Sequence, residues 1–258
     1  MSPIQNITID LNADFGEGYG AYSFGADEAL LSSITSASIA CGWHAGDPRT
    51  MRESVERCLK AGVVIGAHPG YPDRQGFGRR PMGLSAEEVY EAVLYQVGAL
   101  QAFVRAAGGQ LRHIKPHGAL YHQCGSSLEH ALAVARVAAD LGGLAIYGQT
   151  GSKLLEAAVS LGLPAITEGF ADRGYFLDGS LAGRDVRGAV LHDPDKVLEQ
   201  ALSIALRSEV IAIGGGMAKV RADTLCLHGD GPGAAKAAAM IRSGLETVGV
   251  SIAAPRFT

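Results

Sequence analysis

Six apolar runs of this chain each end in a polar or ionisable residue that could do chemistry. Those residues are Asp14, His44, His68, His117, Glu168 and His228. Short apolar runs are typical of buried parallel strands, and the catalytic groups of α/β barrels lie where such strands end. Repeated strand ends of this kind therefore predict a single pocket to which most of the fold contributes.

Imidazole and carboxylate groups from separate strands could hold a divalent metal ion such as zinc or manganese. The candidate ligands are Asp14, His44, His68 and His117. The chain has no local ligand spacing such as H-E-x-x-H, so an acid/base site without a metal is an alternative. In that site carboxylates and histidines would transfer protons, and Lys115 with arginines of the loops would bind anions.

Alternation along two strands separates their polar from their apolar side chains. In an extended chain Asp10, Asn12 and Asp14 point to one side, and the apolar residues between them point to the other. The same alternation holds for His113, Lys115 and His117. Polar groups inside a barrel are costly unless they are paired or used. We expect the residues nearest the strand ends to be functional, whereas Asp10 and His113 fit a buried hydrogen-bond network equally well.

Four other features have an ordinary structural explanation beside a functional one. Asp47 could be a carboxylate beside His44, but it fits better as the N-cap of a helix that starts at Pro48. The four cysteines form no C-x-x-C pair and are expected to be small buried hydrophobic residues. Segment 148–155 follows a strand and opens a helix, but it fails the P-loop pattern. His122 is expected to be an ordinary solvated histidine.

Helical patterns alternate with short apolar runs from one end of the chain to the other. Helices are predicted at about 48–61, 86–107, 127–140, 152–161, 195–207 and 233–247. Strands are predicted near 6–13, 36–42, 63–67, 111–116, 143–147, 164–168, 210–213 and 223–228. Such alternation indicates βα units in the α/β class. We predict one barrel domain over residues 1–258 with seven or eight mostly parallel strands, and an open doubly wound sheet is the alternative.

Two longer loops, at residues 70–83 and 169–181, interrupt this alternation. Each follows an ionisable strand end, and each carries an Asp-Arg pair and aromatic residues. The two pairs are Asp73-Arg74 and Asp172-Arg173. Loops of this length in a compact domain are typically functional or disordered, and these specific charges and aromatic residues favour function. Arg79 and Arg80 either face solvent or reach an anionic ligand.

The composition argues against several classes of protein. Of the 258 residues 47% are hydrophobic and 19% are charged, which is enough for a sizeable core. The formal net charge is −4, with 22 basic and 26 acidic residues well mixed, which argues against a nucleic-acid or membrane partner. No apolar stretch has the length of a membrane span, and residues 1–5 lack the features of a signal peptide. A cytoplasmic location is the expectation.

Several motifs together resemble one known family. They are DLNADFGE from Asp10, ACGWHAGDP from Ala40, GAHPGYPD from Gly66, HIKPHGALY from His113, EGFADRGY from Glu168 and LHGD from Leu227. On these motifs the chain resembles the LamB/YcsF family, which is the family of 5-oxoprolinase A subunits, over nearly its whole length. The resemblance implies a distorted barrel related to the polysaccharide-deacetylase-like group. It also implies ATP-dependent opening of 5-oxoproline to glutamate with partner subunits B and C, with ATP and magnesium as co-substrate.

The resemblance and the strand positions together give a set of candidate site residues. As catalytic residues we expect Asp14, Lys115, His117, Glu168 and Arg173. As substrate-binding residues we expect Asn12, Glu17, His44, His68, Asp73, Arg74, Asp172, His228 and Asp230. In this hypothesis Asp14 or Glu168 directs water at the activated lactam carbonyl, and His117 is the acid. Lys115 and Arg173 stabilise the developing negative charge.

Two other functions are open on the residues alone. The first is a metal-dependent hydrolase or deacetylase that acts without partners on a carbohydrate-like substrate and uses the same histidines. It rests on analogy between barrels, which concerns the fold and not the site. The second is a non-catalytic scaffold, against which the number of ionisable strand ends argues.

Overall fold

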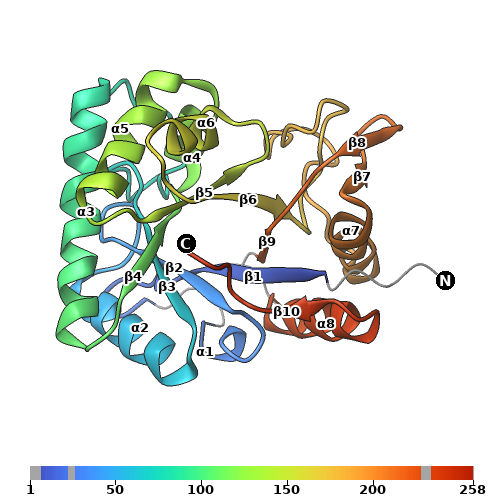
Figure 1. Ribbon diagram of the computed structural model, residues 1–258, viewed down its shortest axis with the longest axis horizontal. Coiled ribbons are helices and arrows are strands. Elements are labelled where there is room, and N and C mark those ends of the chain that lie inside the picture. The colour runs from blue at the N-terminus through green and yellow to red at the C-terminus, as the bar shows by residue number, and fades with distance from the viewer. Residues whose placement is uncertain (1–6, 23–26, 228–233, 258) are drawn as a thin grey trace.

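Seven parallel strands close into a barrel (Figure 1). The computed structural model describes residues 7–22, 27–227 and 234–257. Around the barrel the strands are β1 (Thr8–Phe15), β2 (Ser36–Ala40), β3 (Val64–His68), β4 (Leu111–Ile114), β5 (Ala145–Gln149), β6 (Ala165–Phe170) and β9 (Thr224–Leu227). β9 pairs with both β6 and β1, which closes the sheet, while the short β10 (Ser251–Ile252) pairs with β1 beside it. The predicted barrel is confirmed with seven strands, and the open sheet is wrong.

Helices connect the strands and cover the outside of the barrel (Figure 1). They are α1 (Asp27–Leu30), α2 (Pro48–Ala61), α3 (Ala86–Ala106), α4 (Gly118–Ser126), α5 (Leu128–Asp140), α6 (Lys153–Ser160), α7 (Pro194–Arg207) and α8 (Ala234–Thr247). The predicted N-caps of α2 and α3 are confirmed. Asp47 Oδ1 accepts a hydrogen bond from Thr50 N at 2.9 Å, and Ser85 forms a capping box with Glu88. The predicted helices are confirmed.

The structure differs from the prediction at one expected strand and at four elements that were not expected. The strand expected near 210–213 is wrong as a barrel strand, because β7 (Glu209–Ile211) pairs antiparallel with β8 (Met217–Lys219). Gly214, Gly215 and Gly216 all have positive φ, so the chain reverses between the two strands and β7 pairs with its own continuation. The unexpected elements are β8, the short α1 and β10, and α4, whose helical signal is weakened by glycines near both of its ends.

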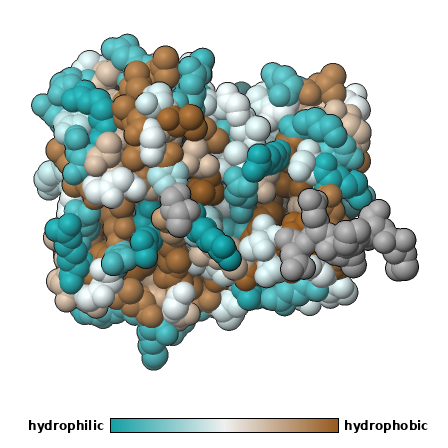
Figure 2. All heavy atoms as spheres, viewed as in Figure 1, coloured by the Kyte–Doolittle hydropathy of each residue, from teal (hydrophilic) through white to brown (hydrophobic). Residues whose placement is uncertain are grey.

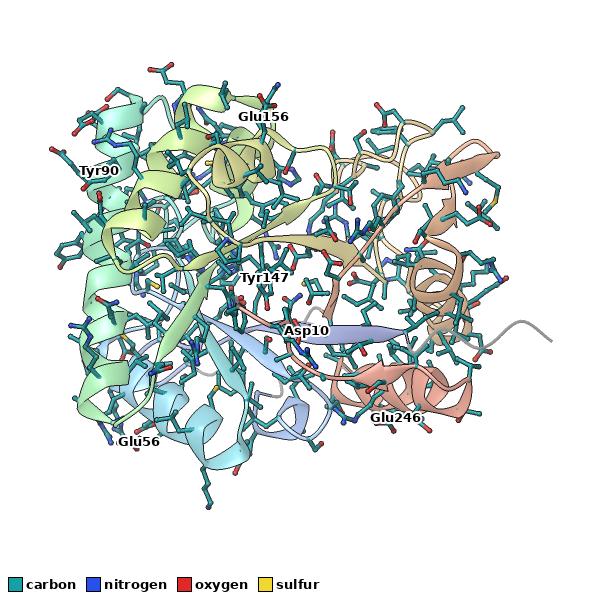
Figure 3. All side chains as sticks on the ribbon, in the orientation of Figure 1. Asp10, Glu56, Tyr90, Tyr147, Glu156 and Glu246 are labelled. Carbon is teal, nitrogen blue, oxygen red and sulfur yellow. The ribbon has the colours of Figure 1, made fainter. Side chains whose placement is uncertain are left out.

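Polar side chains fill the interior of the barrel around Asp10. Its carboxylate accepts hydrogen bonds from Thr224 Oγ1 at 2.6 Å, Ser36 Oγ at 2.8 Å and Tyr147 OH at 3.3 Å. Figure 3 shows Asp10 and Tyr147 at the middle of the barrel. Burial nevertheless raises the pKa of Asp10. Asp10 therefore belongs to a buried hydrogen-bond network, one of the two interpretations that its strand position allowed.

His113 extends this interior network. Its ring stacks on Tyr147 with 3.9 Å between centroids, and its Nε2 lies 3.1 Å from Ser38 Oγ. Gly66 makes room for the ring, because a Cβ at that position would lie 2.0 Å from His113 Nε2. The glycine in β3 is thus required by a close approach across the barrel and not by its backbone angles.

Hydrophobic and hydrophilic side chains are interspersed on the face of the molecule that Figure 2 shows. Within the described parts of the chain, no helix is both long enough and apolar enough to span a membrane. The four cysteines are free and buried, as expected. Burial raises the pKa of Cys41 and of Cys124 to about 12, as for small buried thiols, whereas Cys226 Sγ also lies 3.2 Å from Lys115 Nζ.

Candidate functional site

Lys115 lies at the centre of a polar cluster at the carboxyl end of the barrel. It follows β4, and its Nζ lies 2.9 Å from Asp14 Oδ1, 2.9 Å from Glu168 Oε1 and 3.0 Å from Asn12 Oδ1. Burial by itself disfavours the ammonium form, but the negative charges of Asp14 and Glu168 outweigh it and hold the pKa of Lys115 well above its usual value. Lys115 is therefore a fixed positive charge between carboxylates of β1 and β6.

Asn12 and Tyr121 hold the Glu168 carboxylate in place. Asn12 Nδ2 donates to Glu168 Oε1 at 3.1 Å and to Thr224 Oγ1 at 2.7 Å. Tyr121 OH donates to Glu168 Oε2 at 2.9 Å. Both oxygens of this buried carboxylate thus accept hydrogen bonds from protein donors, which fixes its orientation toward Lys115.

Three histidines and one glutamate converge beside Asp14. They are Glu17, His44, His68 and His117, and one ligand atom of each lies within 4.8 Å of the others. His44 Nε2 lies 3.2 Å from Glu17 Oε1, and His68 Nε2 lies 3.2 Å from Asp14 Oδ1. The His44 ring stacks on His117 with 3.8 Å between centroids. The three predicted histidine ligands are thus grouped, with Glu17 among them and Asp14 adjoining.

Backbone carbonyls assign the tautomers of two of these histidines. His68 Nδ1 donates to Lys115 O at 2.7 Å, and His117 Nε2 donates to Phe77 O at 2.7 Å. The remaining nitrogens, His68 Nε2 and His117 Nδ1, lie 3.0 Å apart. Each directs a lone pair at the other, so a cation or an additional proton is needed to make this contact favourable. Imidazole nitrogens with a nearby carboxylate fit zinc or a similar divalent ion.

Burial keeps two of these imidazoles neutral. It lowers the pKa of His117 to about 3, and it lowers the pKa of His44 well below the usual value for histidine. Positive charge on the neighbouring histidines would lower both pKa values further. Neutral imidazole is the form that binds metal ions, so the electrostatics agree with the donor geometry.

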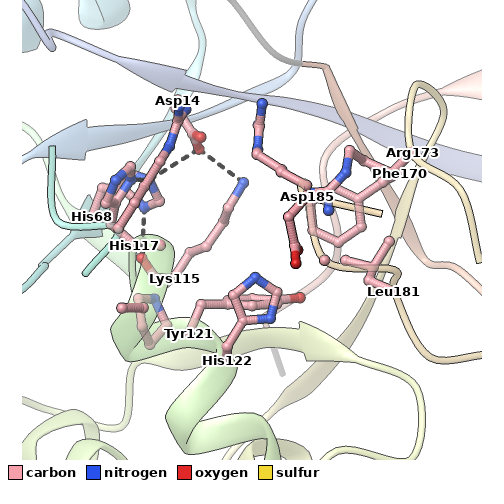
Figure 4. A pocket seen from close by; sticks show the side chains of 16 residues that line it. Asp14, His68, Lys115, His117, Tyr121, His122, Phe170, Arg173, Leu181 and Asp185 are labelled. Carbon is pink, nitrogen blue, oxygen red and sulfur yellow. Dashed lines mark hydrogen bonds and ion pairs between the residues drawn. The ribbon is translucent and has the colours of Figure 1, made fainter. Parts of the chain in front are cut away.

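A cavity of about 390 Å³ lies next to Lys115, a size that suits a small molecule (Figure 4). Its lining residues are Asp14, His68, Arg79, Lys115, Pro116, His117, Gly118, Ala119, Tyr121, His122, Phe170, Arg173, Leu181, Gly183, Arg184 and Asp185. Figure 4 shows Asp14 and Lys115 on one side of the cavity and Arg173 with Asp185 on the other. The loops after β3, β4 and β6 all contribute to it.

In the loop after β3, Asp73 holds the loop's own shape and Arg74 joins it to neighbouring segments. Arg80 Nε donates to Asp73 Oδ2 at 3.0 Å. Arg74 donates to Gly46 O at 3.1 Å and lies over the Tyr19 ring, 3.9 Å from the centroid. Neither Asp73 nor Arg74 is part of the cavity lining, so their expected contact with a substrate stays a prediction.

Arg173 organises the loop after β6. Its Nε donates to Ala189 O at 3.1 Å, and its Nη2 donates to Ala182 O at 2.6 Å. The guanidinium is buried and also lines the cavity. Burial, and then the positive charge of Arg184, lower the pKa of Arg173, and the charge of the adjacent Asp172 acts against them. Two of the Arg173 donors thus hold residues 182–189 in position beside the cavity.

The structure brings together most of the predicted site residues. Those in one connected cluster are Asn12, Asp14, Glu17, His44, His68, Lys115, His117 and Glu168. Arg173 lies on the same cavity, and Asp172 lies beside it. His228 and Asp230 fall outside the described residues, so their predicted role stays a prediction.

Sequence reasoning missed several residues at the cavity, among them Tyr121, His122, Arg184 and Asp185. Tyr121 follows His117 by four residues, and this spacing of one helical turn could have found it if α4 had been predicted. His122 was expected to be an ordinary solvated histidine, yet its side chain lines the cavity. Arg184 lies beyond the predicted loop 169–181, and no sequence pattern marks it.

Together these features define a βα-barrel protein with a small-molecule pocket at the carboxyl ends of its strands. A sequence profile of the LamB/YcsF family matches residues 9–257. The chain therefore belongs to the LamB/YcsF family, as the motifs indicated.

Curated relatives cover nearly the whole chain. The 5-oxoprolinase A subunit of Chloroflexus aggregans is 50% identical over 251 residues, which are 97% of this chain and 100% of the relative. The protein of the same name from Symbiobacterium thermophilum is 51% identical over 248 residues, 96% of this chain and 95% of the relative. A crystal structure of a lactam utilization protein from Thermus thermophilus superposes with a TM-score of 0.91 at 44% identity, covering 96% of this chain and 100% of that one.

Proposed function

We propose that this protein is the A subunit of an ATP-dependent 5-oxoprolinase, which opens the lactam of 5-oxo-L-proline to L-glutamate while ATP is hydrolysed to ADP and phosphate. The support is near-full-length identity of 50% and 51% with two relatives of that name, together with the likeness to a lactam utilization protein. The structural observation that carries the proposal is the buried Lys115 ammonium at the wall of a cavity sized for a small molecule.

The cluster suits addition of water to an amide carbonyl. The water oxygen bonds to the lactam carbon, the carbon–nitrogen bond breaks, and the nitrogen takes up the proton that a base removed from the water. Asp14 lines the cavity and is the proposed base that accepts the proton of the attacking water. Lys115 is the proposed stabiliser of the negative charge on the carbonyl oxygen, a contact worth about 3 kcal/mol in comparable sites.

Two residues take roles that differ from those that the sequence suggested. Glu168 is not among the cavity-lining residues, so in the proposal it orients Lys115 and is not the base. His117 was the expected acid, but burial lowers its pKa to about 3, so at neutral pH it is a neutral imidazole without the second proton of an acid. We assign it with His68 to the binding of a cation or a shared proton.

The finer parts of the proposal concern ATP and the partners. Phosphorylation of the lactam oxygen by ATP, with magnesium, would release ADP and activate the carbonyl. Water addition and cleavage of the carbon–nitrogen bond would then leave an acyl phosphate, which a second water would hydrolyse to the carboxylate of glutamate and inorganic phosphate, and subunits B and C would complete the enzyme. The support is the family resemblance and the name of the relatives, which designates one component of a larger enzyme. We also propose a cytoplasmic location, in which the four free, buried cysteines stay reduced.

The histidine cluster fits a resident divalent metal ion. Glu17, His44, His68 and His117 would hold it, and a bound ion would supply Lewis-acid polarisation of an oxygen in the cavity. The opposed lone pairs of His68 and His117 are the observation that supports this fit. The same observation favours a second candidate function, a metal-dependent hydrolase or deacetylase that acts alone on a carbohydrate-like substrate.

One assay separates the two functions. Glutamate and ADP are measured after 5-oxoproline and ATP are added to this protein alone, and then to the protein mixed with subunits B and C. Joint formation of glutamate and ADP only in the mixture supports the ATP-dependent lactamase. Absence of turnover in both cases, with hydrolysis of an acetylated sugar that chelators abolish, would favour the second function.

A further inference from the structure

The cavity carries more positive than negative charge. Its cationic side chains are Arg79, Lys115, Arg173 and Arg184, and its anionic side chains are Asp14 and Asp185. Glu168, the second carboxylate on Lys115, lies behind it and outside the lining. Asp14 is paired with Lys115, and away from this pair the lining holds Arg173 and Arg184 with one carboxylate, Asp185. Such an excess attracts an anion.

Arg184 is the arginine of this wall with the most freedom to bind a ligand. Among the residues that the structure describes, its guanidinium makes no hydrogen bond and no ion pair. Arg173 instead donates to two backbone carbonyls of the loop that carries Arg184. Arg79 lies over the Phe77 ring, 5.0 Å from the centroid. Arg184 therefore has a full set of donors in a cavity that is positively charged.

His122 and the start of α4 lie on the same wall. Figure 4 shows His122 in front of Tyr121 and facing the side of Asp185. His122, Arg173 and Arg184 all line the cavity, and desolvation, and then the positive charges of the two arginines, lower the pKa of His122. Gly118 and Ala119 at the N-terminus of α4 also line the cavity, and a helix N-terminus is electropositive.

We propose that Arg184, with His122, forms a subsite for the anionic group of the ligand, opposite the Asp14–Lys115 pair. The group is a compact oxyanion, either the carboxylate of a lactam acid or a phosphoryl group, because the planar guanidinium of Arg184 can donate two parallel hydrogen bonds to either. A ligand that spans the cavity would then have its anion on this wall and its amide carbonyl at Lys115. Only this assignment of the carbonyl rests on the proposed function.

Calorimetric titration tests the subsite with three probes: 5-oxoproline, its uncharged analogue 2-pyrrolidinone, and inorganic phosphate. The variants are Arg184→Ala and Arg184→Lys, and the matched control is Arg187→Ala. Arg187 is an exposed arginine of the same loop that does not line the cavity. We expect Arg184→Ala to weaken binding of the anionic probe about tenfold or more, with Arg184→Lys intermediate and Arg187→Ala like the wild type.

The three probes distinguish the sources of the anion. If Arg184→Ala weakens the binding of 5-oxoproline but not that of 2-pyrrolidinone, the subsite binds the carboxylate. If Arg184→Ala weakens the binding of phosphate, the subsite binds a phosphoryl group. If wild type binds phosphate but not 5-oxoproline, the subsite stands and the proposed substrate fails. Wild type that binds neither anion, or Arg184→Ala and Arg187→Ala with the same affinity, would overturn the subsite. Equal thermal unfolding midpoints of the variants check that the fold is intact.

Discussion

His68 Nε2 and His117 Nδ1 lie 3.0 Å apart, although each ring has already given its N–H to a backbone carbonyl. Two lone pairs at this distance repel unless a positive charge lies between them. His44 and Glu17 add an imidazole and a carboxylate within reach of the same position. The arrangement is therefore organised around a cation or a shared proton, and experiment can tell these apart.

We expect purified protein to bind about one zinc or similar divalent ion per chain. His68→Gln and His117→Gln should each weaken this binding roughly tenfold or more, because each removes an imidazole ligand. The exposed His192 is the matched control, and His192→Gln should bind metal like the wild type. Metal content by mass spectrometry and a zinc titration give the result. A wild-type protein without affinity for divalent ions would instead assign a shared proton to the two nitrogens.

Replacing Lys115 should lower the stability of the folded protein. Lys115→Met leaves Asp14 and Glu168 without the ammonium that lies 2.9 Å from each, so we expect a loss of roughly 3–5 kcal/mol in the free energy of unfolding. Lys153 is the control, because its ion pair with Glu156 is largely exposed, and Lys153→Met should cost no more than about 0.5 kcal/mol. Urea unfolding measures the stability of the two variants. Equal stabilities of the two variants would contradict this account of Lys115.

Tyr121 should support activity through Glu168. Tyr121→Phe removes the 2.9 Å hydrogen bond to this buried carboxylate, at an expected cost of about 1.5–3 kcal/mol in unfolding free energy. Tyr90 offers a matched control, because its hydroxyl donates to Asp140 at 2.8 Å on the surface, where the loss should be under about 0.5 kcal/mol. With partner subunits present, Tyr121→Phe should lower the rate of glutamate formation while Tyr90→Phe should not. If both variants retain full turnover, Glu168 needs no support from Tyr121.

The positions of Asp14, His68 and Glu168 could be predicted because two local signals agreed. A short apolar run ending in an ionisable residue identifies a strand end, and a barrel gathers its strand ends at one face. Alternation in β1 separated the polar Asn12 and Asp14 from their apolar neighbours. Both signals depend on residues that are adjacent in the sequence, so a single sequence is sufficient to predict these positions.

The remaining features depend on contacts between distant segments. The β7–β8 hairpin was mistaken for a barrel strand because an apolar run does not say which strand it pairs with. Tautomers of His68 and His117 follow from the carbonyls of Lys115 and Phe77, which local patterns do not place. Arg184 reaches the cavity because Arg173 holds its loop, and an exposed arginine has no periodicity to reveal it.

The stability of the protein should fall as the pH is lowered through the range in which histidines titrate. Burial, and then the positive charge of Lys115, lower the pKa of His113 to about 3 in the folded state, from 6.5 in the unfolded chain. Between these values the unfolded chain binds a proton that the folded protein does not, so His113 contributes a loss of about 1.4 kcal/mol per pH unit as the pH falls. Above a pH of about 6.5 His113 does not contribute to the dependence of the unfolding free energy on pH.

His113→Phe isolates this contribution, because a phenyl ring can keep the stacking on Tyr147 and cannot titrate. We expect its unfolding free energy to fall less steeply with decreasing pH than that of the wild type, by about 1.4 kcal/mol per unit between pH of about 6 and 4. His192→Gln removes an exposed histidine and should keep the wild-type slope. Urea unfolding at several pH values across this range measures the two slopes. Parallel curves for wild type and His113→Phe would mean that His113 accepts a proton within the folded barrel, and that its burial is not what excludes the charged form.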